Sequence, residues 1–253
     1  MPWAIVTASS RGIGFHISKA LAELGLNLVL GSRNMDRLVE AASSLSQEYG
    51  VEALPVQLDM RWRESVEGFI KEVDGIVDSL EVLAVNYGNP SCEPCTLREA
   101  EWSDWMEAAS MYIAATAELF KYVASRWRTR VILVSSFTTR TFHRGLIVAD
   151  TIRKGLEVLV KAAALEYAGR LYPVLLLLGS FPTPGAWETI KAISREKGVK
   201  PETYWKREVE GLSALKRAGR FEELRDLVKF LARAPEYLTG ATILFDGGSL
   251  KCY

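Results

Sequence analysis

The feature that most constrains the fold is a glycine-bearing turn near the N-terminus. Residues 4–14 read Ala-Ile-Val-Thr-Ala-Ser-Ser-Arg-Gly-Ile-Gly, and apolar residues then recur every three or four positions, as in a helix. Gly12 and Gly14 allow the backbone to approach a ligand, and a helix start offers unpaired N–H groups and a positive dipole end to a pyrophosphate. Many strand-to-helix turns bind nothing, so the remaining chain must decide. The turn predicts a strand, a phosphate-binding loop and a helix.

Apolar runs and amphipathic helical patterns alternate along the rest of the chain. Strands buried on both faces read as continuous apolar runs, and 174–178 is the clearest case. Repeated strand–helix–strand units with right-handed crossovers build a doubly wound, mostly parallel sheet with helices on both faces. The pattern predicts an α/β fold with strands at 3–7, 27–31, 52–57, 81–86, 130–135, 172–178 and 241–245, and helices near 12–25, 34–49, 62–77, 97–127, 146–169 and 221–233.

The chain has no internal repeat, low-complexity tract or linker, so residues 1–253 are predicted to form a single domain. Only the segment 180–212, rich in proline, glycine and charge, departs from the alternation. Folds of this type place a lid or substrate loop beyond the carboxyl end of a strand. We therefore expect 180–212 to form the substrate loop.

Composition and charge exclude several classes of partner. The net charge is zero and no basic tract is present, which argues against nucleic acid. No apolar run approaches the roughly 18 residues of a membrane span. The first strand begins at residue 3, so we expect no signal peptide. Three cysteines are too few for a disulfide scaffold, and the expected location is cytoplasmic.

Cys92 and Cys95 form a Cys-x-x-Cys sequence that is compatible with redox chemistry, half of a metal site or a local disulfide. No second pair completes a zinc site, so no metal is expected. The pair follows a strand without opening a helix, which favours a structural disulfide or two free thiols.

Four motifs, in their order and spacing, resemble those of the short-chain dehydrogenase/reductase family over residues 3 to about 248. They are the glycine turn, with Ala8 in place of the family's first glycine; Asn86-Tyr87-Gly88 for Asn-Ala-Gly; Leu178-Gly179 followed by Thr183-Pro184; and Thr239-Gly240 with Asp246-Gly247-Gly248. The resemblance implies a Rossmann domain with a nicotinamide cofactor. It places that cofactor against Thr7, Ser9, Arg11, Gly12, Ile13, Gly14, Ser32, Arg33, Asp59, Met60, Asn86, Gly88, Lys154, Gly179 and Thr183.

The residues at the end of the second predicted strand indicate which cofactor is preferred. An acid there accepts the ribose hydroxyls of NAD, whereas an arginine pairs with the 2′-phosphate of NADP. This chain has Ser32-Arg33 and no acid, with Arg11 in the glycine turn, which favours NADP(H). The alternative is two solvated arginines. Asp59 resembles the family's adenine contact, or it is a helix cap.

The family's catalytic residues are matched only in part. Ser136 stands at the serine position, Lys154 at the lysine position and Asp150 at the tyrosine position, while the asparagine position falls on Ala109, or on Ser110 in a register shifted by one. Tyrosine is the family's proton donor. A carboxyl group with a reference pKa near 3.9 beside a lysine is ionised at neutral pH, so Asp150 is a poor acid.

Other side chains offer alternative proton donors. His143 lies in the loop between Ser136 and Asp150, and a reference pKa near 6.5 suits proton exchange, although a solvent-exposed loop histidine beside Arg140 and Arg144 is the favoured alternative. Tyr87 and Tyr112 are weaker candidates because buried aromatics more often serve packing.

The sequence thus predicts an NADP(H)-dependent oxidoreductase acting on a small alcohol or carbonyl. Ser136 would bind the reacting oxygen, Lys154 the ribose, and Asp150, through water or His143, would move protons. The alternatives are an NADP-binding sensor or scaffold without turnover, and a lyase or isomerase with Asp150 as base. In the family the helices matching 97–127 and 146–169 pair across a dyad, which predicts a homo-oligomer, a tetramer or a dimer.

Overall fold

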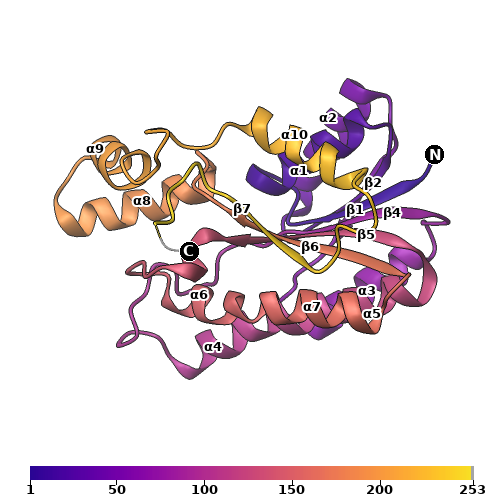
Figure 1. Ribbon diagram of the computed structural model, residues 1–253, viewed down its shortest axis with the longest axis horizontal. Coiled ribbons are helices and arrows are strands. Elements are labelled where there is room, and N and C mark those ends of the chain that lie inside the picture. Colours follow the sequence, from indigo (N-terminus) through magenta and orange to yellow (C-terminus); the bar gives the residue numbers. More distant parts are fainter. Residues whose placement is uncertain (252–253) are drawn as a thin grey trace.

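Seven strands form one sheet in the order β3-β2-β1-β4-β5-β6-β7 in the computed structural model, which describes residues 1–251 (Figure 1). Every neighbouring pair is parallel, so the sheet is wholly rather than mostly parallel, because a crossover separates each strand from the next. All predicted strands are confirmed to within one residue at either end: β1 Trp3–Thr7, β2 Asn27–Ser32, β3 Ala53–Gln57, β4 Leu80–Val85, β5 Thr129–Ser136, β6 Leu171–Leu178 and β7 Ala241–Phe245.

Helices cover both faces of the sheet (Figure 1). One face carries α1 Gly12–Glu23, α2 Met35–Tyr49 and α10 Phe221–Ala232, and the other carries α3 Arg63–Asp74, α4 Trp102–Ala109, α5 Ala115–Arg126, α6 Ile147–Lys154 and α7 Leu156–Glu166. No helix within residues 1–251 is long and apolar enough to span a bilayer.

Two helices predicted as continuous are interrupted. The predicted helix 97–127 begins only at Trp102, where Glu101 and Asp104 form a capping box, and contains a π-helical turn, η1 Ser110–Ala114. The predicted helix 146–169 divides at Gly155 into α6 and α7. Apolar periodicity continues through both interruptions, so the sequence pattern does not reveal them.

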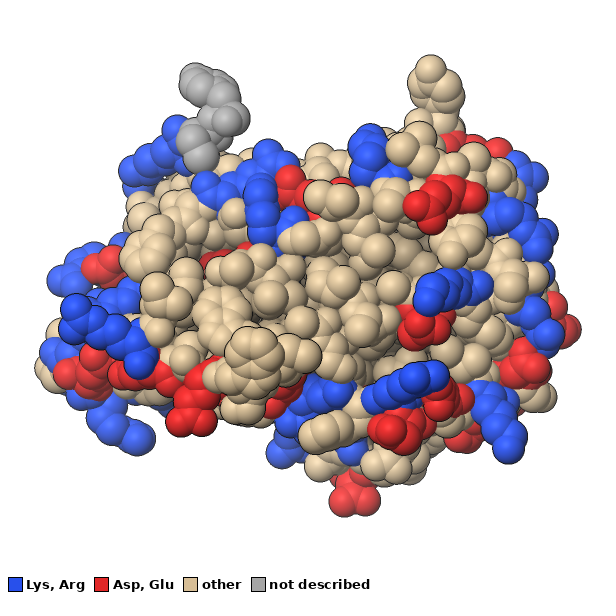
Figure 2. Space-filling model, turned by 90° about the horizontal axis from the view of Figure 1, so that it is seen from below, with Lys and Arg blue, Asp and Glu red and all other residues tan. Residues whose placement is uncertain are grey.

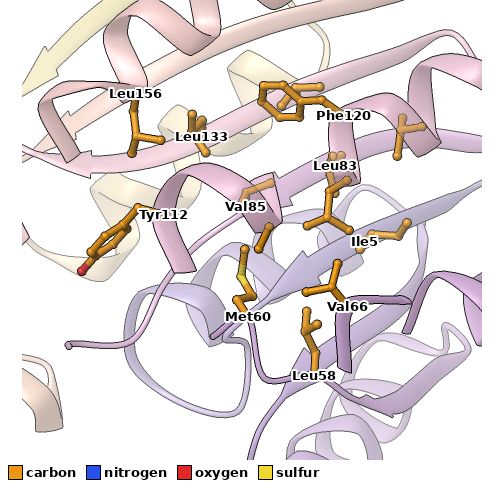
Figure 3. Packing of buried hydrophobic residues seen from close by; sticks show 14 of the residues in the cluster. Ile5, Leu58, Met60, Val66, Leu83, Val85, Tyr112, Phe120, Leu133 and Leu156 are labelled. Atoms are coloured by element: carbon orange, nitrogen blue, oxygen red, sulfur yellow. The ribbon is translucent and has the colours of Figure 1, made fainter. Parts of the chain in front are cut away.

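Successive side chains along each strand point to opposite faces of the sheet, so the core divides into two clusters. Ile5 and Leu83 face α3 and α5 and pack with Val66 and Phe120 (Figure 3), whereas Val6 belongs to the cluster beneath α1 and α10. Burying each large apolar side chain contributes about 1.5–3 kcal/mol. This packing fixes the carboxyl ends of the strands, from which the loops of the site extend.

The segment 180–212 extends beyond the carboxyl ends of the strands (Figure 1). It contains α8 Pro184–Lys197, α9 Pro201–Tyr204 and a second π-helical turn, η3 Trp205–Glu210. Thr183 caps α8 by accepting a hydrogen bond from the amide of Ala186 at 3.0 Å, and Pro184 occupies the first helical turn. Trp187 and Trp205 stack with ring centroids 4.7 Å apart, which ties α8 to η3.

Candidate active site

A cleft of about 500 Å³ opens between the carboxyl ends of β1, β2 and β4 and the inner side of α8. The strand order reverses between β1 and β4, and open α/β sheets bind ligands at such a switch point. Most of the predicted cofactor residues line the cleft: Arg11, Gly12, Ile13, Ser32, Arg33, Asp59, Met60, Asn86, Gly88 and Thr183. Thr7, Ser9, Gly14, Lys154 and Gly179 are not among the lining residues of the described chain.

The glycine turn leaves the backbone amides at the start of α1 open to the cleft. A Cβ on Gly14 would lie 2.3 Å from the carbonyl oxygen of Ala8, so only glycine fits there. Ala8 itself has a φ of 47°, the left-handed conformation that glycine adopts most easily. Arg11 at the N-cap of α1 provides no side-chain cap, and the first turn contains no acid. The amide groups at this helix start are therefore available to an anion.

Thr7 and Asn86 join the two strands at the switch point. The Thr7 hydroxyl donates to the carbonyl of Asn86 at 2.7 Å, and the Asn86 amide donates to the Thr7 hydroxyl at 2.9 Å. Asn86 Nδ2 also donates to the carbonyl of Ala8 at 3.3 Å. Behind the turn, the buried Ser9 hydroxyl donates to the carbonyl of Gly31 at 3.3 Å. These buried bonds hold the turn in position from behind the cleft.

Two arginines line the cleft, together with an acid that forms an ion pair with a third arginine. Arg33 lines it beside Ser32, whose hydroxyl lies 3.0 Å from that of Ser10. Arg11 donates to Glu188 of α8 at 3.0 and 3.3 Å. Burial opposes ionisation of Asp59, but the hydrogen bonds from Arg61, the shortest 2.6 Å, lower its pKa below the ordinary value. Asp59 is thus an ionised partner of Arg61.

A chain of polar groups connects β5 to α6. Thr138 Oγ1 lies 2.8 Å from Ser136 Oγ and donates to Asp150 Oδ1 at 2.7 Å. Arg153 Nη2 donates to the same carboxylate oxygen at 3.0 Å. Burial raises the pKa of Asp150, while Arg153 and Thr138 oppose the rise. Asp150 is therefore held on the protein side rather than pointing freely into the cleft.

The structure does not bring Lys154 to this group. Its ammonium pairs with Glu157 at 2.9 Å, and its side chain is 51% exposed. Arg153, one residue earlier, is the buried cation, with a side chain that is 16% exposed. Successive helical residues point about 100° apart, so a shift of one residue decides which cation faces inward. Arg153 was not among the predicted site residues.

The predicted aromatic candidates are packed against neighbours. His143 contacts the ring of Phe137 edge-on, with centroids 5.4 Å apart, and burial lowers its pKa. Tyr87 Oη lies 2.5 Å from Thr116 Oγ1. Tyr112 lies at the margin of the apolar cluster with its hydroxyl directed away from the other labelled side chains (Figure 3), and burial raises its pKa.

Sequence reasoning also missed Glu93, which lines the cleft on the loop between β4 and α4. Burial raises the pKa of its carboxyl group to about 7. No motif marks this position, since a glutamate in a loop is ordinarily solvated. Cys92 and Cys95 on either side are free thiols whose Sγ atoms lie 2.7 Å apart.

Comparisons with known proteins agree with this geometry. A family model described as enoyl-(acyl carrier protein) reductase matches residues 7–249. A 3-oxoacyl-[acyl-carrier-protein] reductase of Aquifex aeolicus is 28% identical, over 97% of this chain and 96% of the relative. The structure of L-sorbose reductase from Gluconobacter frateurii, complexed with NADPH and L-sorbose, is 26% identical with a TM-score of 0.90, over 100% of this chain and 97% of that one.

Proposed function

The chain belongs to the short-chain dehydrogenase/reductase family, and from that membership we propose that it is an NADP(H)-dependent oxidoreductase acting on a small alcohol or carbonyl. The observation that carries the choice of cofactor is the positive charge of Arg33 in the cleft. Arg33 lies there beside Ser32, and the acid nearby, Asp59, is committed to Arg61. When bound, NADPH supplies a hydride to the carbonyl carbon.

This chain's residues fit that cofactor in a definite arrangement. The amides near Gly12 and Ile13 at the start of α1 would bind the pyrophosphate. Arg33 and Ser32 would bind the 2′-phosphate, and Met60 would contact the adenine side. The segment 180–212 would act as a lid, because Glu188 of α8 reaches the glycine turn through Arg11.

On the substrate side, Ser136 would donate a hydrogen bond to the reacting oxygen, while its Oγ accepts one from the backbone amide of Thr138 at 3.2 Å. Arg153, rather than Lys154, would supply the cation of α6. Counting four residues back from Lys154 gives Asp150, and from Arg153 it gives the buried Ala149. Neither register supplies a phenol, so the proton must come from another group.

Arg33→Ala should raise the dissociation constant for NADPH about tenfold or more and leave that for NADH nearly unchanged. A charge-assisted contact to a phosphate contributes roughly 1.5–3 kcal/mol, and only NADPH carries the 2′-phosphate. Isothermal calorimetry measures both constants. Arg37→Ala, which removes an exposed arginine from α2, is the matched control and should change neither. Equal loss of both cofactors in Arg33→Ala would contradict the assignment.

Turnover separates an oxidoreductase from the alternatives. The purified protein should oxidise NADPH in the presence of at least one member of a panel of ketones, aldehydes and sugars, followed at the nicotinamide absorbance. Tight NADPH binding with no turnover on any member would favour a sensor or scaffold. Conversion of a substrate without a change in nicotinamide absorbance would favour a lyase or isomerase.

We propose that a second copy of the chain packs against the surface formed by α4 and α7. Trp102 and Met106 on α4 and Val158 and Leu165 on α7 are exposed by 53–81%. Figure 2 looks onto this side and shows that its middle carries few charged side chains. Light scattering at micromolar concentration should return a multiple of 28.2 kDa. A mass of one chain would contradict the dimer and the tetramer alike.

A further inference from the structure

Glu93 projects from the loop that follows β4 into the cleft. It lines the cleft together with Tyr87, Met111 and, from α8, Thr189. Its carboxyl group makes no hydrogen bond to any other residue in the described part of the chain, unlike the other two acids that line the cleft, Asp59 and Glu188. A carboxyl group that faces a ligand-sized cleft and is not committed to a partner is free to exchange a proton with a ligand.

Packing between two loops fixes the position of Glu93. The amide of Cys95 donates to the carbonyl of Gly145 at 2.9 Å, and Cys95 and Leu146 form an isolated parallel bridge. Gly145 leaves room for Pro94, since a Cβ on Gly145 would lie 3.0 Å from the Cβ of Pro94. Because residues 145–146 lead directly into α6, this contact ties the loop that carries Glu93 to the helix that carries Asp150 and Arg153.

Glu93 interacts electrostatically with Arg153 and Asp150 of α6. The guanidinium group of Arg153 also lies over the ring of Tyr112 at 5.5 Å. One guanidinium group compensates one buried carboxylate, and Asp150 takes that charge because it accepts hydrogen bonds from both Arg153 and Thr138. Two carboxyl groups near a single cation cannot both ionise easily, so the group without hydrogen bonds is the one that is more readily protonated.

We propose that the carboxyl group of Glu93 donates the proton to the substrate oxygen during reduction and accepts it during oxidation. This inference rests on the proposed oxidoreductase function. In reduction, bound NADPH would supply a hydride to the carbonyl carbon, and the electron pair of the C=O π bond would move to oxygen. That oxygen forms an O–H bond with the proton of Glu93, and the carboxylate then takes up one proton (H⁺) from the solvent. The products are the alcohol and NADP⁺.

The pH dependence follows from the surroundings of Glu93. Burial raises the pKa of Glu93, Arg153 opposes the rise and Asp150 adds to it, and together these effects bring the pKa to about 7. The other ionisable groups facing this cluster include Tyr112 in η1, Cys92 on the same loop, Tyr87 beside Arg153, and His143, which interacts with Asp150. The acid form donates the proton, so kcat/KM for reduction should fall as the pH rises through about 7. The carboxylate accepts the proton, so kcat/KM for oxidation should fall as the pH drops through the same value.

Glu93→Gln tests the proposal because glutamine preserves the shape of the side chain and cannot transfer a proton. We expect kcat/KM for reduction to fall about a hundredfold or more, and the decline around pH 7 to disappear. The dissociation constant for NADPH, measured by fluorescence, should stay within about twofold. Glu93→Asp keeps the acid one carbon further back, so it should retain the pH profile with an intermediate rate. Glu196→Gln, at an exposed site on α8, is the control and should match the native protein.

An infrared titration provides a readout that does not depend on activity. The difference between native and Glu93→Gln spectra should contain the band of a protonated carboxyl group that disappears as the pH rises through about 7. Native turnover combined with an unchanged pH profile and more than a tenth of the rate in Glu93→Gln would overturn the role of Glu93 alone. Absence of NADPH turnover in the native protein, despite binding, would overturn the oxidoreductase function and this role together.

Discussion

Arg153→Leu should lower the free energy of unfolding by about 3–5 kcal/mol. Removing one partner of a buried ion pair leaves the other charge uncompensated, and losses of about this size follow. The side chains of Arg153 and Asp150 are only 16% and 12% exposed. Denaturant unfolding followed by circular dichroism measures the change. The double replacement of Arg153 and Asp150 by leucine should recover most of the loss, because neither charge of the pair is then left uncompensated.

Lys154→Leu is the matched control, one residue along the same helix. Lys154 is 51% exposed, and its partner Glu157 also accepts a hydrogen bond from Arg140, so its removal should cost less than about 1 kcal/mol. A larger loss for Lys154→Leu than for Arg153→Leu would contradict the assignment of Arg153 as the inward cation of α6.

Gly14→Ala should weaken NADPH binding about a hundredfold or more. The new Cβ would lie 2.3 Å from the carbonyl oxygen of Ala8 and 3.0 Å from Asn86 Nδ2, so the turn must move away from the start of α1. Loss of two charge-assisted contacts to the pyrophosphate, at roughly 1.5–3 kcal/mol each, accounts for an effect of this size. Fluorescence titration gives the dissociation constant.

Gly68→Ala on α3 is the control for the same chemical change. No atom lies within 4 Å of a Cβ built there, and alanine is the better helix former by roughly 0.5–1 kcal/mol. This variant should melt slightly higher than the native protein and bind NADPH normally. Native NADPH affinity in folded Gly14→Ala would show that the turn does not cradle the pyrophosphate.

The sequence by itself determined the architecture, because the signals for it are local. Continuous apolar runs such as 174–178 identified strands buried on both faces, and the alternation of runs with helical patterns identified the doubly wound sheet. The glycine turn located the candidate cofactor cleft, since the need for glycine at position 14 arises within eight residues of the chain.

The tertiary structure decided the orientation of side chains and their charge states. Arg153 and Lys154 are equivalent by composition, and only the packing of α6 fixed which one is buried. Arg11 is paired with Glu188, a residue 177 positions away that no local pattern connects to it. The pKa of Glu93 is raised because loop packing buries its carboxyl group, with a smaller contribution from Asp150. Electrostatic energies depend on burial and on distances between groups remote in sequence, and these exist only in the folded chain.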